Sequence, residues 1–232
     1  MCSRDDEKSM KYPVNRIFQT IQGEGCFTGV PAIFIRLQGC SVMCSWCDTK
    51  YTWKQDEFER VPSRDILVKT IDNSRWASCT EEDILALILN QDWTACHIVI
   101  TGGEPCLYNL IPLTEVLEKQ GFTCQIETSG TQEIHCTSRT WVTLSPKIDM
   151  YHKLPIVPKA LIRSDEIKYP IEKKSDINKL DILLASLKDI KKRVIALQPV
   201  SQKERATNLC IETCILRNWR LSIQTQKYLK II

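Results

Sequence analysis

Three cysteines, Cys40, Cys44 and Cys47, follow one another in a C-x3-C-x2-C spacing. Thiolates bind zinc or iron–sulfur clusters. A structural zinc site needs four ligands, usually supplied in two C-x2-C or H-x3-H pairs, and the sequence has no second pair with either spacing. Three thiolates on a cluster of four irons would leave one iron free to bind a small molecule. The spacing therefore favours a catalytic cluster, and the alternatives are three ordinary cysteines or a zinc knuckle with a distant fourth ligand.

The composition limits the class of protein. The chain has 232 residues, 43% of them hydrophobic, and a net charge of +3, which suits one globular domain and is too small to indicate nucleic-acid binding. Its longest aliphatic run, residues 84–89, is too short to cross a membrane, and no signal peptide is evident. We expect a cytoplasmic protein without a membrane or nucleic-acid partner, whose nine other cysteines are mostly small buried side chains.

Strands and helices are predicted to alternate along most of the chain. Short β-branched runs predict strands at Ala32–Gln38, Cys96–Thr101, Thr123–Thr128, Trp141–Ser145, Glu166–Tyr169, Val194–Gln198 and Leu221–Thr225. Helices are predicted after a capping box at Thr80–Asp83, over Leu110–Gln120 with Gly121 ending it, after a cap at Ser175, and over Glu204–Arg217. The lysines between Lys168 and Arg193 are interpreted as a solvated helix face.

This alternation predicts an α/β fold, a partial, incomplete βα barrel of about six strand–helix units with a mainly parallel sheet. Residues 1–9 are predicted to be a flexible tail and residues 10–232 a single domain. In such folds ligands bind at the carboxyl ends of the strands. The segments that follow the predicted strands are polar or glycine-rich: GCSVMCSWCDT, GGEP, SGT, PK and PVS.

The cysteine loop, with Trp46 before its last cysteine, resembles the signature of the radical S-adenosylmethionine (SAM) superfamily. Thr101-Gly102-Gly103-Glu104-Pro105 resembles the glycine-rich segment that binds the methionine amino group of SAM in that superfamily. Glycines suit this place because a backbone without Cβ can approach a ligand closely. The resemblance implies a [4Fe-4S] cluster on Cys40, Cys44 and Cys47, and SAM on its open iron.

A closer resemblance covers nearly the whole chain after Met10. The segments FQTIQGEG, TGVP, RLQGC, CDT, ETSG and SPK together are similar to the 7-carboxy-7-deazaguanine synthase family. That family converts 6-carboxy-5,6,7,8-tetrahydropterin to 7-carboxy-7-deazaguanine with release of ammonia, in queuosine biosynthesis. The resemblance implies a carbon–nitrogen lyase in which a 5′-deoxyadenosyl radical takes a hydrogen from C6 of the pterin and SAM is regenerated.

The resemblance also implies residue roles. The residues implied in SAM binding are Gly103, Glu127, Ser145, Pro146, Lys147 and Gln198, those implied in substrate binding are Ile21, Gln22, Gly23, Arg36 and Thr101, and Thr49 is implied as the ligand of Mg²⁺. A surface ion pair is the alternative for Lys147 and Glu127. Arg36 lies within an apolar strand, where either a substrate carboxylate or a structural salt bridge could pair with its guanidinium.

One position departs from the family pattern. Gln226 stands where relatives generally carry His, and glutamine cannot titrate, so no acid–base role is assigned to it. The family resemblance further implies a homodimer and an electron donor such as flavodoxin or ferredoxin. Two alternative functions remain at this stage: a glycyl-radical activase, which would share the cluster but act on a protein backbone, and a zinc-binding interaction module.

Overall fold

The computed structural model describes residues 10–148 and 154–231, so the predicted tail at residues 1–9 lies outside the described residues. Its centre is one sheet of nine strands in the order β3-β1-β2-β4-β5-β6-β7-β8-β9. The strands are β1 Tyr12–Ile21, β2 Pro31–Leu37, β3 Ala77–Cys79, β4 His97–Gly102, β5 Thr123–Thr128, β6 Trp141–Leu144, β7 Glu166–Ile171, β8 Val194–Pro199 and β9 Arg220–Leu221. The helices are α1 Glu81–Leu89, α2 Ile111–Lys119, α3 Pro158–Arg163, α4 Lys174–Ala185, α5 Glu204–Arg217 and α6 Thr225–Leu229.

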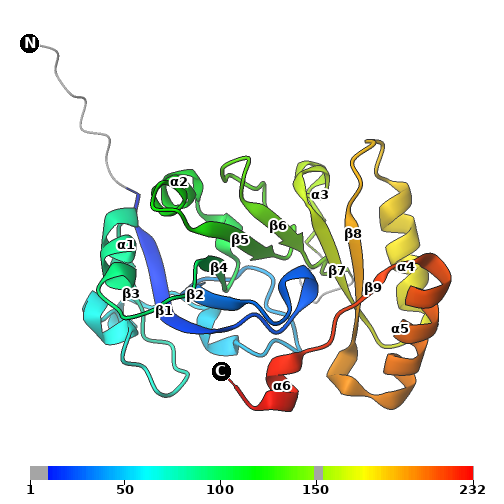
Figure 1. Ribbon diagram of the computed structural model, residues 1–232, viewed down its shortest axis with the longest axis horizontal. Coiled ribbons are helices and arrows are strands. Elements are labelled where there is room, and N and C mark those ends of the chain that lie inside the picture. The colour runs from blue at the N-terminus through cyan, green and yellow to red at the C-terminus, as the bar shows by residue number, and fades with distance from the viewer. Residues whose placement is uncertain (1–9, 149–153, 232) are drawn as a thin grey trace, which may run out of the picture.

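The sheet is mainly parallel and open. Strand β2 pairs in parallel with β4, and parallel pairing continues through β5, β6, β7 and β8 to β9. Strand β1 runs antiparallel to both β2 and β3. Helices α1 to α5 lie around the outside of the curved sheet, whereas α6 lies apart from them near the C-terminus (Figure 1). The predicted α/β fold, an incomplete βα barrel, is confirmed.

Local signals explain several element boundaries. Thr80 accepts a hydrogen bond from Asp83 N at 3.1 Å and donates its own N–H to the Asp83 carboxylate at 2.9 Å, which is the predicted capping box of α1. Gly121 follows the end of α2 with a φ of 90°, a left-handed conformation that favours glycine. The predicted helices over residues 110–120 and 204–217 are thus confirmed, the second with its predicted bounds.

Other predicted boundaries are wrong. Helix α4 begins at Lys174, because the Asp176 side chain accepts hydrogen bonds from the backbone N–H groups of Glu172 and Lys173, so Ser175 is not its cap. The strand predicted at Leu221–Thr225 pairs only over Arg220–Leu221, and Thr225 begins α6. Strands β1 and β3 and helices α3 and α6 were not predicted from the sequence.

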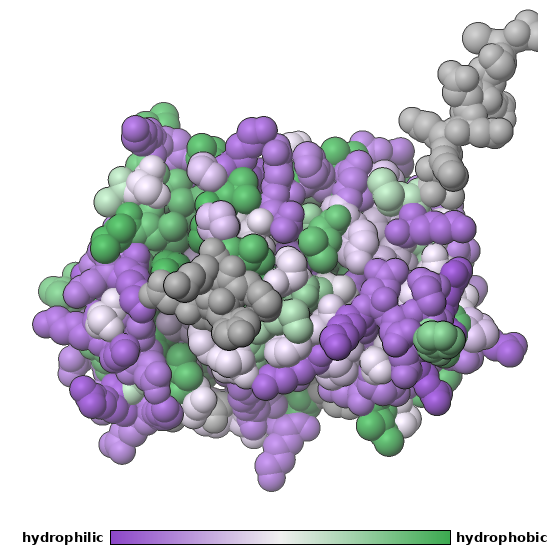
Figure 2. Space-filling model, turned by 180° about the vertical axis from the view of Figure 1, so that it is seen from behind, coloured by the Kyte–Doolittle hydropathy of each residue, from purple (hydrophilic) through white to green (hydrophobic). Residues whose placement is uncertain are grey.

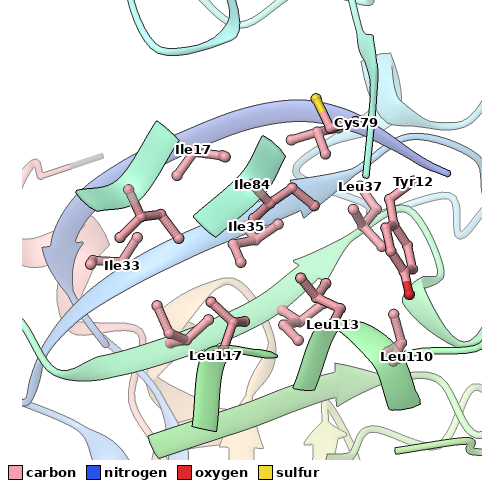
Figure 3. Close-up of a cluster of buried hydrophobic side chains, with 14 of the residues drawn as sticks. Tyr12, Ile17, Ile33, Ile35, Leu37, Cys79, Ile84, Leu110, Leu113 and Leu117 are labelled. Atoms are coloured by element: carbon pink, nitrogen blue, oxygen red, sulfur yellow. The ribbon is translucent and has the colours of Figure 1, made fainter. Parts of the chain in front are cut away.

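Alternation along the strands separates two environments. On β2, Ile33, Ile35 and Leu37 are buried against α1 and α2, together with side chains of β1 and β4 (Figure 3). A second apolar cluster joins β6, β7 and β8 to α3, α4 and α5. Because successive side chains on a strand point to opposite faces, the alternate residues of these strands line the inner face of the sheet, and many of them are polar.

Lys168 is one of these inner residues. It lies on β7 with only 5% of its surface exposed, between Ile167 and Tyr169, which belong to the outer apolar cluster. The interpretation of the segment from Lys168 to Arg193 as a solvated helix face is therefore wrong at Lys168, because strand alternation directs this side chain inward.

The outer surface is ordinary for such a fold. On the face seen in Figure 2, hydrophilic side chains predominate and hydrophobic ones form smaller groups between them. Among residues 10–148 and 154–231, no helix is both long and apolar enough to cross a membrane.

Candidate active site

The three cysteines of the C-x3-C-x2-C loop line one cavity. It has a volume of about 290 Å³ and lies at the carboxyl ends of the parallel strands, as predicted. The cavity wall includes the segments after β4, β5, β6 and β8, which the sequence marked as polar or glycine-rich. No three His, Cys, Asp or Glu side chains in the described part of the chain are grouped closely enough for a single metal ion. A cluster of four irons occupies more space than one ion.

Backbone hydrogen bonds hold the cysteine loop. Gly39, at a φ of 100°, turns the chain out of β2, and its N–H donates to Thr52 O at 2.7 Å. The Cys40 N–H donates to Trp53 O at 3.0 Å. Val42 and Cys44 are buried, and Leu154 packs against them. Burial raises the pKa of the Cys40 and Cys44 thiols, an effect that Lys147 opposes at Cys44. The loop thus presents three thiols from a largely apolar shell, which fits an iron–sulfur cluster.

The glycine-rich segment after β4 packs directly on this loop. Gly103 N donates to Leu37 O at 2.9 Å, and Glu104 N donates to Gly39 O at 2.8 Å. A Cβ on Gly103 would collide with the Gly39 carbonyl, and one on Gly102 would collide with the backbone of Leu37. The sequence argument assigned these glycines to close approach by a ligand; the structure shows that they are needed for close approach of two backbones.

The carboxylate of this segment joins a third loop. Glu104 is buried and accepts hydrogen bonds from the Thr128 hydroxyl at 2.6 Å, from Ser129 N at 2.8 Å and from the Ser129 hydroxyl. The segments after β2, β4 and β5 are therefore tied together around one cavity.

The residues predicted to bind SAM lie mostly in this cavity. Gly103, Glu127, Ser145, Lys147 and Gln198 line it, whereas Pro146 is buried and is not among the lining residues. Lys147 Nζ donates to Ser145 Oγ at 2.7 Å rather than forming the surface ion pair considered as its alternative, and burial lowers its pKa. Trp53 Nε1, also in the lining residues, is a buried donor without a hydrogen-bond partner in the described part of the chain. This mixture of aromatic, hydroxyl, amide and charged groups fits a nucleoside that carries an amino acid.

All five residues predicted to bind substrate line a second cavity. It has a volume of about 190 Å³ and is formed by Ile21, Gln22, Gly23, Arg36, Thr101 and further residues of β1 and β2. Arg36 Nε is buried without a hydrogen-bond partner in residues 10–148 and 154–231. Its guanidinium lies 5.5 Å from the centre of the Phe18 ring and 5.9 Å from that of Tyr51. An acceptor such as a carboxylate in the cavity would satisfy this group.

Thr49, the predicted magnesium ligand, also lines the second cavity. Its hydroxyl lies 3.4 Å from Gly102 O and 3.5 Å from Cys47 Sγ, where the two cavities are adjacent. A hydroxyl beside a carbonyl offers the oxygen ligands that magnesium prefers. The site fits the ion with water and substrate as the remaining ligands.

The two cavities share a charged wall. Lys168 Nζ donates to Glu24 Oε2 at 2.7 Å and to Glu127 Oε2 at 2.8 Å, and all three residues line both cavities. Burial by itself would raise the pKa of Glu24, but Lys168 and two glutamines lower it to about 2. Burial and the nearby Glu24 raise the pKa of Glu127 to about 7 despite Lys168. The junction therefore holds one carboxylate that is firmly ionised and one that titrates near neutral pH.

Sequence reasoning missed Glu24 and Lys168 as site residues, although Glu24 lies within a motif that carried the resemblance. The alternation of Glu166, Lys168 and Pro170 with Ile167, Tyr169 and Ile171 was a signal that could have placed Lys168 on the inner face.

Gln226 also lies in the second cavity. Its Nε2 donates to Glu24 Oε1 at 2.8 Å, and its Oε1 is buried without a partner in the described residues.

Comparison with known proteins agrees with this site. Residues 21–160 match the family model of the 4Fe-4S single cluster domain. The chain is 60% identical over 222 residues to the 7-carboxy-7-deazaguanine synthase of Escherichia coli (strain K12), covering 96% of this chain and 100% of the relative. It is 54% identical over 222 residues to the enzyme of the same name from Buchnera aphidicola, with the same coverage. The crystal structure of QueE from Escherichia coli superposes with a TM-score of 0.91 at 60% identity, covering 93% of this chain and 94% of that one.

An open βα sheet with three cysteines after its first parallel strand, and a cavity suited to SAM beside them, defines a radical SAM protein with a [4Fe-4S] cluster. Within that class the identities are high over nearly the whole chain. The chain belongs to the 7-carboxy-7-deazaguanine synthase family.

Proposed function

We propose that this chain converts 6-carboxy-5,6,7,8-tetrahydropterin to 7-carboxy-7-deazaguanine with release of ammonia; its relatives are named as synthases of that product. The observation that carries the proposal is the pair of cavities that meet at Glu24, Lys168 and Glu127, one with the three cysteines and the other with Arg36. The relatives' name favours neither a glycyl-radical activase nor a zinc-binding module.

Each cavity has a distinct task in this proposal. Cys40, Cys44 and Cys47 would hold the cluster, which together with bound SAM would supply the radical chemistry that starts the reaction. Ser145, Lys147 and Gln198 position the amino acid and nucleoside of SAM, while Glu127 accepts hydrogen bonds from the ribose hydroxyls. The surrounding loops restrict access of water to the reaction.

In the second cavity, Arg36 binds the substrate carboxylate, and Gln22, Gly23 and Thr101 contact the pterin ring. Thr49 would supply one oxygen ligand to a magnesium ion, which would add positive charge on the side of the cavity where the substrate binds. The overall change loses ammonia and needs no net oxidant, so the protein must hold the substrate while one ring contracts. A rigid parallel sheet with polar side chains on its inner face is suited to that task.

The test is direct. The full chain, purified without oxygen, is expected to contain about four irons per chain. With SAM, magnesium and a reductant it should convert the carboxytetrahydropterin to the carboxydeazaguanine and ammonia, which mass spectrometry detects. Cys44→Ala should lose both the iron and the product. Product formation by Cys44→Ala, or a wild-type chain that binds four irons and makes no product, would refute the proposal.

We further propose that the protein acts in the cytoplasm as a homodimer and receives its electron from a flavodoxin or ferredoxin. Support comes from family membership alone. Sedimentation of the purified protein tests the dimer, cell fractionation tests the location, and turnover with each reduced carrier in place of a chemical reductant tests the donor.

A further inference from the structure

Gln125 lies beneath both cavities and lines neither of them. It is on the inner face of β5 and is completely buried. Its amide makes all four hydrogen bonds available to such a group. Oε1 accepts from His97 Nε2 at 3.0 Å and from Gln22 Nε2 at 3.3 Å, while Nε2 donates to Glu127 Oε1 at 3.1 Å and to Thr143 Oγ1 at 3.0 Å.

Three neighbours determine which way this amide points. Gln22 Oε1 accepts from Glu24 N at 3.1 Å, so the Gln22 Nε2 turns toward Gln125. The Thr143 hydroxyl donates to Glu166 Oε2 at 2.9 Å, so its oxygen is left to accept from Gln125. The ionised Glu127 carboxylate accepts only.

His97 supplies the remaining contact at the amino end of β4. Its Nδ1 lies 2.9 Å from the Thr123 hydroxyl, and its ring packs against Phe27 in a tilted arrangement, with the centroids 4.3 Å apart. The orientation that the other three neighbours give Gln125 turns Oε1 toward His97 Nε2, which puts the His97 proton on Nε2 and leaves Nδ1 to accept from the Thr123 hydroxyl, itself 3.4 Å from Cys96 O. Burial lowers the pKa of His97, which keeps the ring neutral near pH 7.

We propose that Gln125, with its amide fixed by these four contacts, is a positioning residue that holds Gln22 in the substrate cavity and Glu127 in the SAM cavity. The inference rests on the proposed function, because it assigns a task to residues of that site. If the Gln125 amide were flipped, its oxygen instead of its nitrogen would lie 3.1 Å from Glu127 Oε1, and the hydrogen bond to the charged carboxylate would be lost. One side chain thus supports a contact of the substrate and a contact of the cofactor.

Protonation of Glu127 makes SAM binding depend on pH in this proposal. Lys168 and Glu166 of β7, Glu24 after β1 and Lys147 after β6 are the charged groups that act on it. The Gln125 N–H stabilises the charged form of Glu127, so loss of that donor raises a pKa that already lies near 7. The ribose hydroxyls need the charged form as their acceptor, so SAM binding weakens as pH falls through that pKa.

The experiment measures equilibrium binding of SAM to the cluster-loaded full chain by calorimetry, without oxygen, reductant or pterin, from about pH 6 to about pH 9. The test variant is Gln125→Leu. The matched control is Ile126→Val, which changes the next residue of β5 on the opposite face, against the outer apolar cluster.

For the wild type, we expect affinity to fall below about pH 7. In Gln125→Leu the midpoint should move up by about one pH unit, with about fivefold weaker binding at pH 7 that recovers toward pH 9, because one hydrogen bond to a charged group is lost. Ile126→Val should keep the wild-type midpoint. An unshifted midpoint in Gln125→Leu, or equal shifts in both variants, would overturn the inference.

A second measurement is made on the wild-type chain, and a variant serves only to assign its signals. Nitrogen-15 NMR of the wild-type imidazoles should show a neutral His97 protonated on Nε2, assigned by the loss of its signals in His97→Gln; protonation on Nδ1 would overturn the proposed orientation of Gln125. Wild-type turnover separates this inference from the proposed function: a wild type that forms product but lacks the Nε2–H form of His97 refutes the positioning role alone.

Discussion

Replacing Lys168 with methionine removes the cation that joins Glu24 to Glu127. The two ion-pair distances are 2.7 and 2.8 Å, and the lysine side chain is only 6% exposed. Breaking a buried ion pair by removal of one partner costs about 3–5 kcal/mol, since the remaining charge stays desolvated. Lys168→Met leaves two such carboxylates facing one another, so we expect the free energy of unfolding to fall by about that amount at pH 8.

The loss should depend on pH in a defined direction. Without Lys168 the pKa values of Glu24 and Glu127 rise, so the folded variant binds more protons than the unfolded chain, whose glutamates titrate near about 4.3. Stability of the variant therefore decreases as pH rises through the raised pKa values, and its deficit relative to the wild type is larger at pH 8 than at pH 6. In the wild type, the lowered pKa of Glu24 contributes stability that is lost as pH falls from about 4.3 to about 2.

Urea unfolding of the full chain, followed by tryptophan fluorescence at both pH values, measures these free energies. The matched control is Lys159→Met, which breaks a surface pair with Glu133 at 3.0 Å where the lysine is 74% exposed. That pair is worth about 0–1 kcal/mol. Equal losses in the two variants, or a Lys168→Met deficit that does not change with pH, would refute the assignment of a buried charged junction.

Four further outcomes are expected. Arg36→Ala should keep its iron and raise the apparent KM for the pterin about 10- to 100-fold, as loss of a charged hydrogen bond implies; an unchanged KM would remove Arg36 from the site. Gly103→Ala should lower both iron content and SAM binding, because its Cβ displaces the Gly39 carbonyl, and normal iron content would contradict this. Thr49→Val should raise the magnesium concentration needed for half-maximal turnover, whereas an unaltered magnesium dependence would exclude the hydroxyl as a ligand. Thr80→Ala should cost about 1 kcal/mol in urea unfolding with turnover preserved, and an unaffected midpoint would show that the capping box contributes no stability.

The outer half of the fold could be predicted from the sequence because it depends on local pattern. Strand β5 and helix α5 have their predicted bounds, since each combines a clear apolar period with recognisable ends. Strand β1 was missed because Asn15, Arg16 and Gln19 interrupt its apolar residues. Those polar side chains find partners far along the chain, as when Asn15 donates to Gln38 at 2.7 Å, and local pattern does not report such partners.

Some residues of the site could likewise be predicted from local sequence, and others could not. Spacing alone indicated the cysteines, and their convergence on one cavity follows from the strand ends. Glu24 and Lys168 are 144 residues apart, and each looks like an ordinary surface charge until the fold brings them together. Gln125 had a local signal, because it alternates with Cys124 and Ile126 and so shares a face with Glu127. Burial of its amide, however, also depends on three partners outside β5, which local pattern does not report.

The contact between the Gly102–Gly103 pair and the turn at Gly39 has a consequence for protein engineering. Peptide groups of the two segments touch with no space for a side chain, so neither can be redesigned while the other is kept. A library that varies only one of them would yield mostly proteins unable to assemble their metal centre. New cofactor specificity would have to be built by exchanging both segments together, as a single transplanted unit.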